Sequence, residues 1–169
     1  MSNLRLINET NASSVSSLLL TDIFSADFDI YKLTINSDGF SGNSALTVKY
    51  LNSSGSIINS FNYDYARQLL KADTSTPGED RATNQSFYYT GELSNTGLGQ
   101  VLYIFNPYSS SSYTFSLFEN QSMSSTNGRG GKGITVFKQT IPITGIRLYS
   151  ANNGTITNLN VRTYGLAVT

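Results

Sequence analysis

The chain of 169 residues contains no cysteine, no histidine and no tryptophan. Without cysteine it can form neither a disulfide framework nor a thiolate metal site. Without histidine, the usual Ser-His and Cys-His nucleophile pairs cannot be built, and neither can a histidine-ligated zinc or iron site. These absences exclude most hydrolase designs and most transition-metal sites.

Charge is scarce and balanced. The 11 basic and 11 acidic residues cancel, and no block of like charge interrupts the sequence. Proteins that bind nucleic acid or anionic membranes carry a basic surface, so we expect neither partner. No run approaches the eighteen apolar residues of a membrane span, and the N-terminus lacks the basic and apolar regions of a signal peptide. We therefore expect a soluble chain with no classical export signal.

The chain is rich in small polar and aromatic residues instead. Ser, Thr and Asn supply 60 of the 169 residues, and the apolar side relies on 11 Tyr and 9 Phe. This mixture favours pleated strands and Asx or Ser turns over helix. The length suits one domain with a core of its own. We predict a single domain over residues 13–169, preceded by an N-terminal arm over residues 1–12 with Leu4 and Leu6 as its docking residues.

Alternation of apolar and polar residues predicts strands along the whole chain. In residues 28–36, the side chains of Tyr31, Leu33 and Ile35 are predicted to point inward. Residues 46–50 repeat the pattern, and the turn-rich residues between the two segments suggest that they form a hairpin. The other predicted strands cover 4–8, 15–24, 57–61, 63–71, 87–93, 101–106, 113–119, 133–140, 146–149 and 159–168.

The predicted strand over 113–119 shows the alternation most plainly. Its odd positions Tyr113, Phe115 and Leu117 are apolar and its even positions are hydroxylic. The pattern predicts that the apolar side faces the core. Short strands separated by turn signals are typical of a sandwich. We therefore predict an all-β, two-sheet antiparallel β-sandwich of jelly-roll type.

Acidic residues offer two alternatives for chemistry. Asp27 with Asp29, or Glu79 with Asp80, are the nearest approach to a carboxylate pair for glycoside cleavage. Asp22, Asp27 and Asp29 could supply oxygen ligands to calcium. An Asp at a strand start more often accepts a hydrogen bond from a turn amide, and the spacing of a calcium loop is absent. We predict no catalytic residue, no metal site, no cofactor and no enzymatic activity.

The glycine-rich segment 127–133 has a P-loop composition without its spacing. A P-loop has a Gly separated by four residues from its Gly-Lys pair, and a Ser or Thr after that pair, whereas Thr126 and Gly133 occupy those places. We predict a flexible connection that exposes Arg129 and Lys132 for contact with a neighbouring subunit.

Four tyrosines are candidates for a binding surface: Tyr88, Tyr89, Tyr108 and Tyr113. Exposed Tyr rings stack on sugars or form interface hot spots, because they bury area at low entropic cost and keep a hydroxyl for hydrogen bonding. The alternative for each is a place in the core or on a sheet face. The lack of tryptophan weakens the sugar alternative.

Several segments resemble the small virion structural proteins of tailed phages, especially marine ones. The resemblance runs from about Leu18 to the end of the chain and rests on short strand-and-turn patterns: FDIYKL at 28–33, YDYA at 63–66, FNPYSSSSYT at 105–114, GKG at 131–133, ITGIRLY at 143–149 and VRTYG at 161–165.

The resemblance implies a β-sandwich that decorates the capsid or forms part of a head or tail fibre, commonly as a trimer. The expected function is therefore that of a non-enzymatic virion structural protein, assembled in the host cytoplasm. Its expected partners are copies of itself, as a homotrimer, and the major capsid protein or a fibre or tail protein. The alternative is a carbohydrate-binding module that serves as a receptor-binding tip for a host surface glycan. A surface with little charge suits a protein packed many times against its own copies.

Overall fold

The computed structural model describes residues 3–41, 44–93, 96–124 and 126–166. Within these ranges the chain forms strands and no helix, which confirms the all-β fold class. Accordingly, no described segment is a helix with the length and apolarity to cross a membrane. The strands are β1 Leu4–Ala12, β2 Ser17–Leu20, β3 Ile30–Ser37, β4 Gly39–Phe40, β5 Ser44–Asn52, β6 Tyr63–Lys71, β7 Gly78–Gln85, β8 Tyr88–Leu93, β9 Leu98–Phe105, β10 Thr114–Ser124, β11 Asn127–Phe137, β12 Ile143–Ser150, β13 Ile156–Thr157 and β14 Leu159–Leu166.

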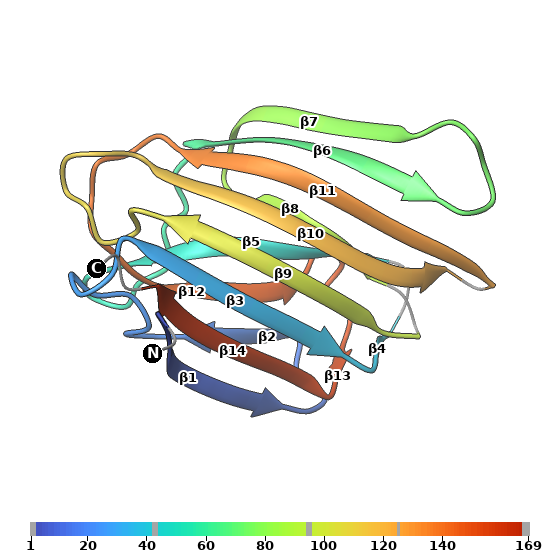
Figure 1. Ribbon diagram of the computed structural model, residues 1–169, viewed down its shortest axis with the longest axis horizontal. Coiled ribbons are helices and arrows are strands. Elements are labelled where there is room, and N and C mark those ends of the chain that lie inside the picture. Colours follow the sequence, from blue (N-terminus) through green and yellow to red (C-terminus); the bar gives the residue numbers. More distant parts are fainter. Residues whose placement is uncertain (1–2, 42–43, 94–95, 125, 167–169) are drawn as a thin grey trace.

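Two large antiparallel sheets pack face to face as a sandwich. The larger sheet has eight strands in the order β1-β14-β3-β9-β10-β11-β6-β7, and the smaller has four in the order β2-β12-β5-β8. A short ladder of β13 and β4 forms a third sheet. In Figure 1 the eight-stranded sheet lies in front and the four-stranded sheet behind it. The larger sheet therefore turns one whole face away from the core.

The strand order is that of a jelly roll with an expanded seventh strand. A jelly roll has eight strands, which are numbered 1 to 8 in chain order. Here the first six are β2, β3, β5, β6, β7 and β8, and the eighth is β12. The meander β9–β10–β11 takes the seventh position, so the smaller sheet reads 1-8-3-6 and the larger reads 2-7-4-5. This is the order that two linked Greek keys produce. The expansion widens the larger sheet, and β14 and β1 extend it further at the β3 edge.

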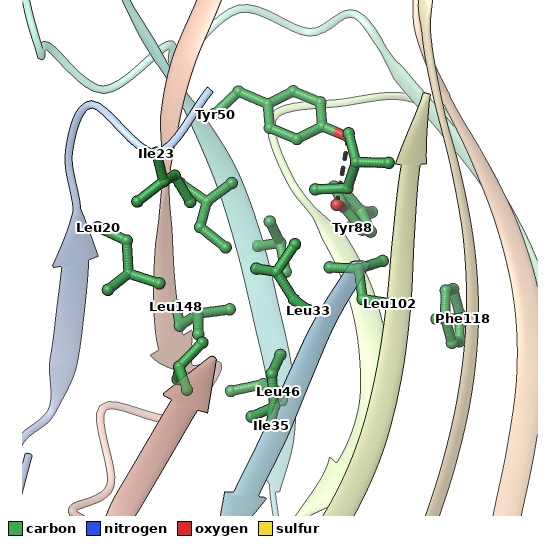
Figure 2. Close-up of a cluster of buried hydrophobic side chains, with 14 of the residues drawn as sticks. Leu20, Ile23, Leu33, Ile35, Leu46, Tyr50, Tyr88, Leu102, Phe118 and Leu148 are labelled. Carbon is green, nitrogen blue, oxygen red and sulfur yellow. Dashed lines mark hydrogen bonds between the residues drawn. The ribbon is translucent and has the colours of Figure 1, made fainter. Parts of the chain in front are cut away.

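The core lies between the two sheets. Leu33 and Leu102 point inward from the larger sheet, and Leu46 and Leu148 point inward from the smaller one, all fully buried (Figure 2). The inward orientation predicted for Tyr31, Leu33 and Ile35 is confirmed, as is that of Leu46, Val48 and Tyr50. Burial of such side chains contributes about 1.5–3 kcal/mol each, so alternation on these two strands supplies much of the stability.

A cluster of tyrosines closes one end of this core. The Tyr50 ring packs against the rings of Tyr63 and Tyr88 with centroids 5.5 and 5.8 Å away. Its hydroxyl lies 2.7 Å from Oγ of Ser116, and the Tyr63 hydroxyl accepts a hydrogen bond from the backbone N–H of Tyr50 at 2.9 Å. Burial raises the pKa of Tyr50 to about 12, and burial also raises the pKa values of Tyr63 and Tyr88. The cluster is a structural network, with the hydroxyls satisfied inside the protein.

Several sequence predictions about connectivity are wrong. The segments containing β3 and β5 do not form a hairpin: β3 pairs with β14 and β9, whereas β5 pairs with β12 and β8 in the other sheet. The chain changes sheets between them. Residues 57–61 contribute only an isolated bridge, and β7 forms a strand over Gly78–Gln85, where none was predicted. The predicted strand over 63–71 is confirmed with the same bounds.

The glycine-rich segment 127–133 is also not a flexible connection. It forms the first part of β11, which pairs with β10 on one side and β6 on the other. Glycine was read as a sign of flexibility, but here it makes room for bulky neighbours such as Phe118. Glycine inside a strand often marks such a close approach.

Residues 4–12 of the predicted arm form β1, an edge strand that pairs with β14. Leu4 is half-buried and Leu6 is half exposed on this strand. Met1 and Ser2 lie outside the described residues, as do residues 167–169 at the end of the last predicted strand. A docking role for Leu4 and Leu6 remains a prediction.

Candidate functional site

The outer face of the eight-stranded sheet exposes an unusual set of apolar side chains. On β10, Thr114 and Ser116 are 1% and 3% exposed, whereas Phe115 and Leu117 are 46% and 42% exposed. The hydroxylic side of this strand therefore faces the core and the apolar side faces solvent. This reverses the orientation predicted from the alternation.

The register of the neighbouring strands extends this apolar surface. Phe115 lies beside Phe105 of β9 and Val136 of β11, and Leu117 lies beside Tyr103 and Ile134. We call the six residues in these two rows the apolar band: Tyr103, Phe105, Phe115, Leu117, Ile134 and Val136.

Ile134 is the most exposed member of the band, at 60%. Side chains directly opposite each other on antiparallel strands have Cβ atoms about 4.5–5.5 Å apart, so the six form one continuous patch. Contiguous apolar patches of this kind on soluble proteins mark interaction surfaces. The band is therefore our candidate functional site.

A shallow hollow adjoins the band on the side of β6 and β7. It has a volume of about 870 Å³, and its floor includes Phe115, Leu117 and Ile134. Ala66, Ala82 and Thr83 supply its far side. The surface is thus a broad, open depression with small residues beside large ones, and its shape fits the face of another protein better than a small ligand, which pockets usually enclose.

The next two rows of the same face are polar. Glu119 and Lys132 lie opposite each other on β10 and β11, followed by Gln121 opposite Gly130. Beyond them, a second hollow of about 580 Å³ is lined by Thr34, Asn36, Glu119, Gln121, Arg162 and Tyr164. The outer face is therefore divided across the strands into an apolar half and a polar half.

Several charges near this face are already paired. Arg162 contacts Glu9 at 2.9 Å, and Lys138 contacts Asp64 at 2.8 Å. The hydrogen bond from Arg162 lowers the pKa of Glu9, and the hydrogen bond from Lys138 lowers the pKa of Asp64. Among the described residues, Glu119 and the facing Lys132 have no ion-pair partner.

The outer face of the smaller sheet is different. Lys49 and Arg147 lie opposite each other there, and Leu19 is beside Arg147. Burial and the neighbouring Arg147 lower the pKa of Lys49, whose ammonium donates to Oδ1 of Asn59 at 2.7 Å. The guanidinium of Arg147 lies 4.5 Å from the centre of the Tyr149 ring. Among the described residues of this face, the exposed aliphatic side chain is Leu19, which lies beside two cations, and they form no comparable apolar band.

The four tyrosines selected from sequence do not share a surface. Tyr88 cannot stack on a sugar or a partner, because its side chain points from β8 into the space between the sheets and is fully buried. Tyr89 packs edge-on against Tyr65 and beneath the Arg67 guanidinium. Tyr108 and Tyr113 are 40% and 45% exposed in the connection between β9 and β10.

The two predicted intersubunit cations also differ. Lys132 is exposed on the outer face next to Glu119, whereas Arg129 is half-buried with its Nε enclosed by protein. Lys132 therefore belongs to the candidate surface. An intersubunit contact by either residue stays a prediction.

Two groups of acidic residues are the candidates for chemistry, the three aspartates for calcium and Glu79 with Asp80 for glycoside cleavage. No group of three His, Cys, Asp or Glu side chains that could hold a metal ion occurs within the described part of the chain, so Asp22, Asp27 and Asp29 do not form the calcium cage considered above. Asp80 pairs with Arg67 at 2.8 Å, and Glu79 is exposed on the alternate side of β7. The Glu79 and Asp80 side chains thus point to opposite faces and do not form a carboxylate pair.

Comparisons with known proteins assign no family. No protein family matches the chain, and no curated protein matches it in sequence. The similar solved structures include T=1 particles derived from infectious bursal virus, at 9% identity and a TM-score of 0.19, and the VP2 subviral particle of infectious bursal disease virus, at 8% identity and a TM-score of 0.14. Each alignment covers 96% of this chain, which spans little more than a third of those proteins: 39% and 36%. Similarity this weak supports no assignment.

Proposed function

We propose that this protein is a non-enzymatic structural component of a virus particle, of the capsid-decoration or fibre type found in tailed phages. It works through protein-protein contacts, and the apolar band on the outer face of the eight-stranded sheet is its principal contact surface.

The observation that carries the proposal is the exposure of three neighbouring apolar side chains, Phe115 and Leu117 on β10 and Ile134 opposite Leu117 on β11. Each would lose apolar area to a partner, at about 25 cal/mol per Å² removed from water. A monomer that worked alone would gain nothing from leaving this surface in water. The virion context rests on the resemblance of the strand-and-turn segments to phage structural proteins.

The proposal is tested with virus particles assembled from a viral genome that lacks the gene for this protein. Purified protein is added back, and bound protein is measured by co-sedimentation and electron microscopy. We expect the native chain to bind at regular positions and Ile134→Asp to bind at least tenfold more weakly. Leu19→Asp is the matched control, because Leu19 is 50% exposed on the smaller sheet. Absence of the native protein from wild-type particles, by mass spectrometry, would refute the proposal.

Glycan binding is the second candidate function, and the polar hollow favours it. Tyr164 and Arg162 stand beside the amides of Asn36 and Gln121 in that hollow. Planar amides and a neighbouring ring are suited to sugar hydroxyls and sugar faces. A glycan array with the native chain and the Asn36→Ala, Gln121→Ala double variant tests it. Binding that disappears in the variant would support this function, and no binding by the native chain would eliminate it.

A further inference from the structure

Resting on the assembly role above, we propose that the apolar band binds the same band of a second copy of this chain. The two copies are related by a two-fold axis that runs parallel to the strands, between β10 and β11, above the outer face. Each copy lays its β10 on the β11 of the other.

The cross-strand pairs nearest this axis are complementary when exchanged. Leu117 is the neighbour of Ile134, and Glu119 is the neighbour of Lys132. A two-fold axis between the strands keeps each row in place and exchanges the two strands. Leu117 therefore faces Ile134 of the other copy, and Glu119 faces its Lys132, with both contacts occurring twice. Such self-complementarity is the requirement of an isologous interface.

The charges nearest the axis support a second copy as the occupant. Glu119 and Lys132 are exposed, and neither forms an ion pair within the described residues. Across the axis each acquires a partner of opposite sign at the border of an apolar contact. Opposite charges in this position fix register and partner choice more than they add affinity. A partner with a different sequence would have to supply both signs in the same row.

The available area is also sufficient. The overlap comprises the six strands β3, β9, β10, β11, β6 and β7 of the larger sheet. At a spacing of about 4.8 Å and a length of about eight residues, six strands cover roughly 750 Å². A stable interface buries about 800 Å² on each partner. The pairing above uses only β10 and β11, the two strands nearest the axis.

The decisive experiment mixes two charge-reversal variants. In a dimer of Glu119→Lys, the introduced lysine of each copy would face Lys132 of the other, so both attractive contacts become repulsive. In a dimer of Lys132→Glu, both contacts would join two glutamates. We expect the dimer dissociation constant of each variant alone, measured by sedimentation velocity, to be at least about tenfold higher than that of the native chain. In an equimolar mixture the lysines of one chain face the glutamates of the other, so labelled Glu119→Lys should sediment as a dimer again. Intrachain repulsion is the same alone and mixed, and cannot explain the recovery.

Arg5→Glu is the matched partner for the control mixture. It changes the net charge as much as Lys132→Glu, but Arg5 lies on β1, away from the axis. The dimer of labelled Glu119→Lys with Arg5→Glu has one attractive and one like-charged contact, so it should form more weakly than the dimer with Lys132→Glu. Recovery with Arg5→Glu equal to that with Lys132→Glu, no recovery with Lys132→Glu, a native trimer or a native monomer at high concentration would each overturn the proposal.

The two proposals can fail separately. A native chain that binds particles but remains monomeric, or forms the trimer implied by the phage resemblance, would refute the two-fold contact and leave the assembly role standing. A dimer that passes the mixing experiment, from a protein absent from particles, would refute the virion role and leave the contact standing.

Discussion

The ring of Phe118 covers the backbone of Gly133, its partner across β10 and β11. A Cβ at position 133 would meet that ring and would lie 2.7 Å from the carbonyl oxygen of Ala66. The glycine is therefore required by space, since the phenyl ring occupies the volume that a side chain would fill. Phe118 is fully buried and the strand cannot move away from it without opening the core.

We expect Gly133→Ala to destabilise the protein by about 1–3 kcal/mol, the usual cost of overpacking a core. Gly128→Ala on the same strand is the control, because its Cβ would meet nothing closer than the Ala72 Cβ at 4.0 Å. Its unfolding free energy should change by less than about 0.5 kcal/mol. Urea unfolding measures both, and equal costs for the two variants would contradict the packing explanation.

Buried tyrosines should limit stability at high pH. The pKa of Tyr50 is raised to about 12 by burial, whereas an unfolded Tyr titrates near 10. The unfolded state therefore loses its proton first, so this contribution to stability is complete below about pH 10 and is lost between about pH 10 and 12. Tyr50→Phe should show a shallower alkaline decline in chemical unfolding, despite losing the Ser116 hydrogen bond. An unchanged alkaline slope would show that Tyr50 is not responsible.

Gln100 is a buried polar residue whose replacement should stabilise the fold. Its side chain is 4% exposed on the inner side of β9, and neither amide atom has a hydrogen-bond partner among the described residues. Burying an unpaired amide costs about 1–3 kcal/mol, so Gln100→Met should raise the unfolding free energy by about 0.5–2 kcal/mol.

The neighbouring Asn120 provides the contrast for this test. Its Nδ2 donates to the carbonyl oxygen of Thr90 at 2.7 Å and so links the two sheets. Asn120→Leu should destabilise by about 1–3 kcal/mol, because it removes this bond and leaves its acceptor buried. Thermal unfolding of both variants decides the point. A Gln100→Met variant less stable than the native chain would mean that the amide has a role beyond those contacts.

Acid should weaken the ion pair between Asp64 of β6 and Lys138. The hydrogen bond from Lys138 lowers the pKa of Asp64, so the pair contributes stability above the unfolded pKa of about 3.9 and loses it as pH falls through the lower folded value. Asp64→Asn should therefore show a flatter decline of stability below about pH 4. Lys138→Met should flatten it in the same way. An acid limb that keeps its native slope in both variants would contradict this assignment.

Sequence alternation predicted strands far better than it predicted their partners. Leu33 and Leu46 were placed inward correctly because each strand has one apolar face, and such a face must meet the core. Which sheet a strand joins depends on long-range pairing. The periodicity of the two strands therefore could not show that they belong to different sheets and do not form a hairpin. β7 was not predicted as a strand because GEDRATNQ has no apolar face; pairing with β6 holds it in the sheet.

The candidate surface includes residues of the segment 113–119, where the alternation of apolar and polar residues is clearest. The prediction that the apolar side of this strand faces the core was wrong. Both sides of β10 carry apolar residues, with Phe115 and Leu117 on one and Phe118 on the other. The inner side is decided by tertiary contacts: Phe118 fits over a glycine, and Ser116 bonds the Tyr50 hydroxyl. Aromatic residues on both sides of a strand are the sequence signal that could have indicated an apolar outer face.

The pairing of β1 with β14 has a consequence for synthesis in the cell. Leu4 pairs with Leu166, and β3 lies between β14 and β9, so the larger sheet joins early and late parts of the chain. During translation β1 emerges first but has no neighbour until residues 159–166 leave the ribosome. Such long-range pairing makes folding slow, in the millisecond-to-second range. On a polysome producing many copies, the unpaired edge of β3 is available to neighbouring nascent chains throughout that interval.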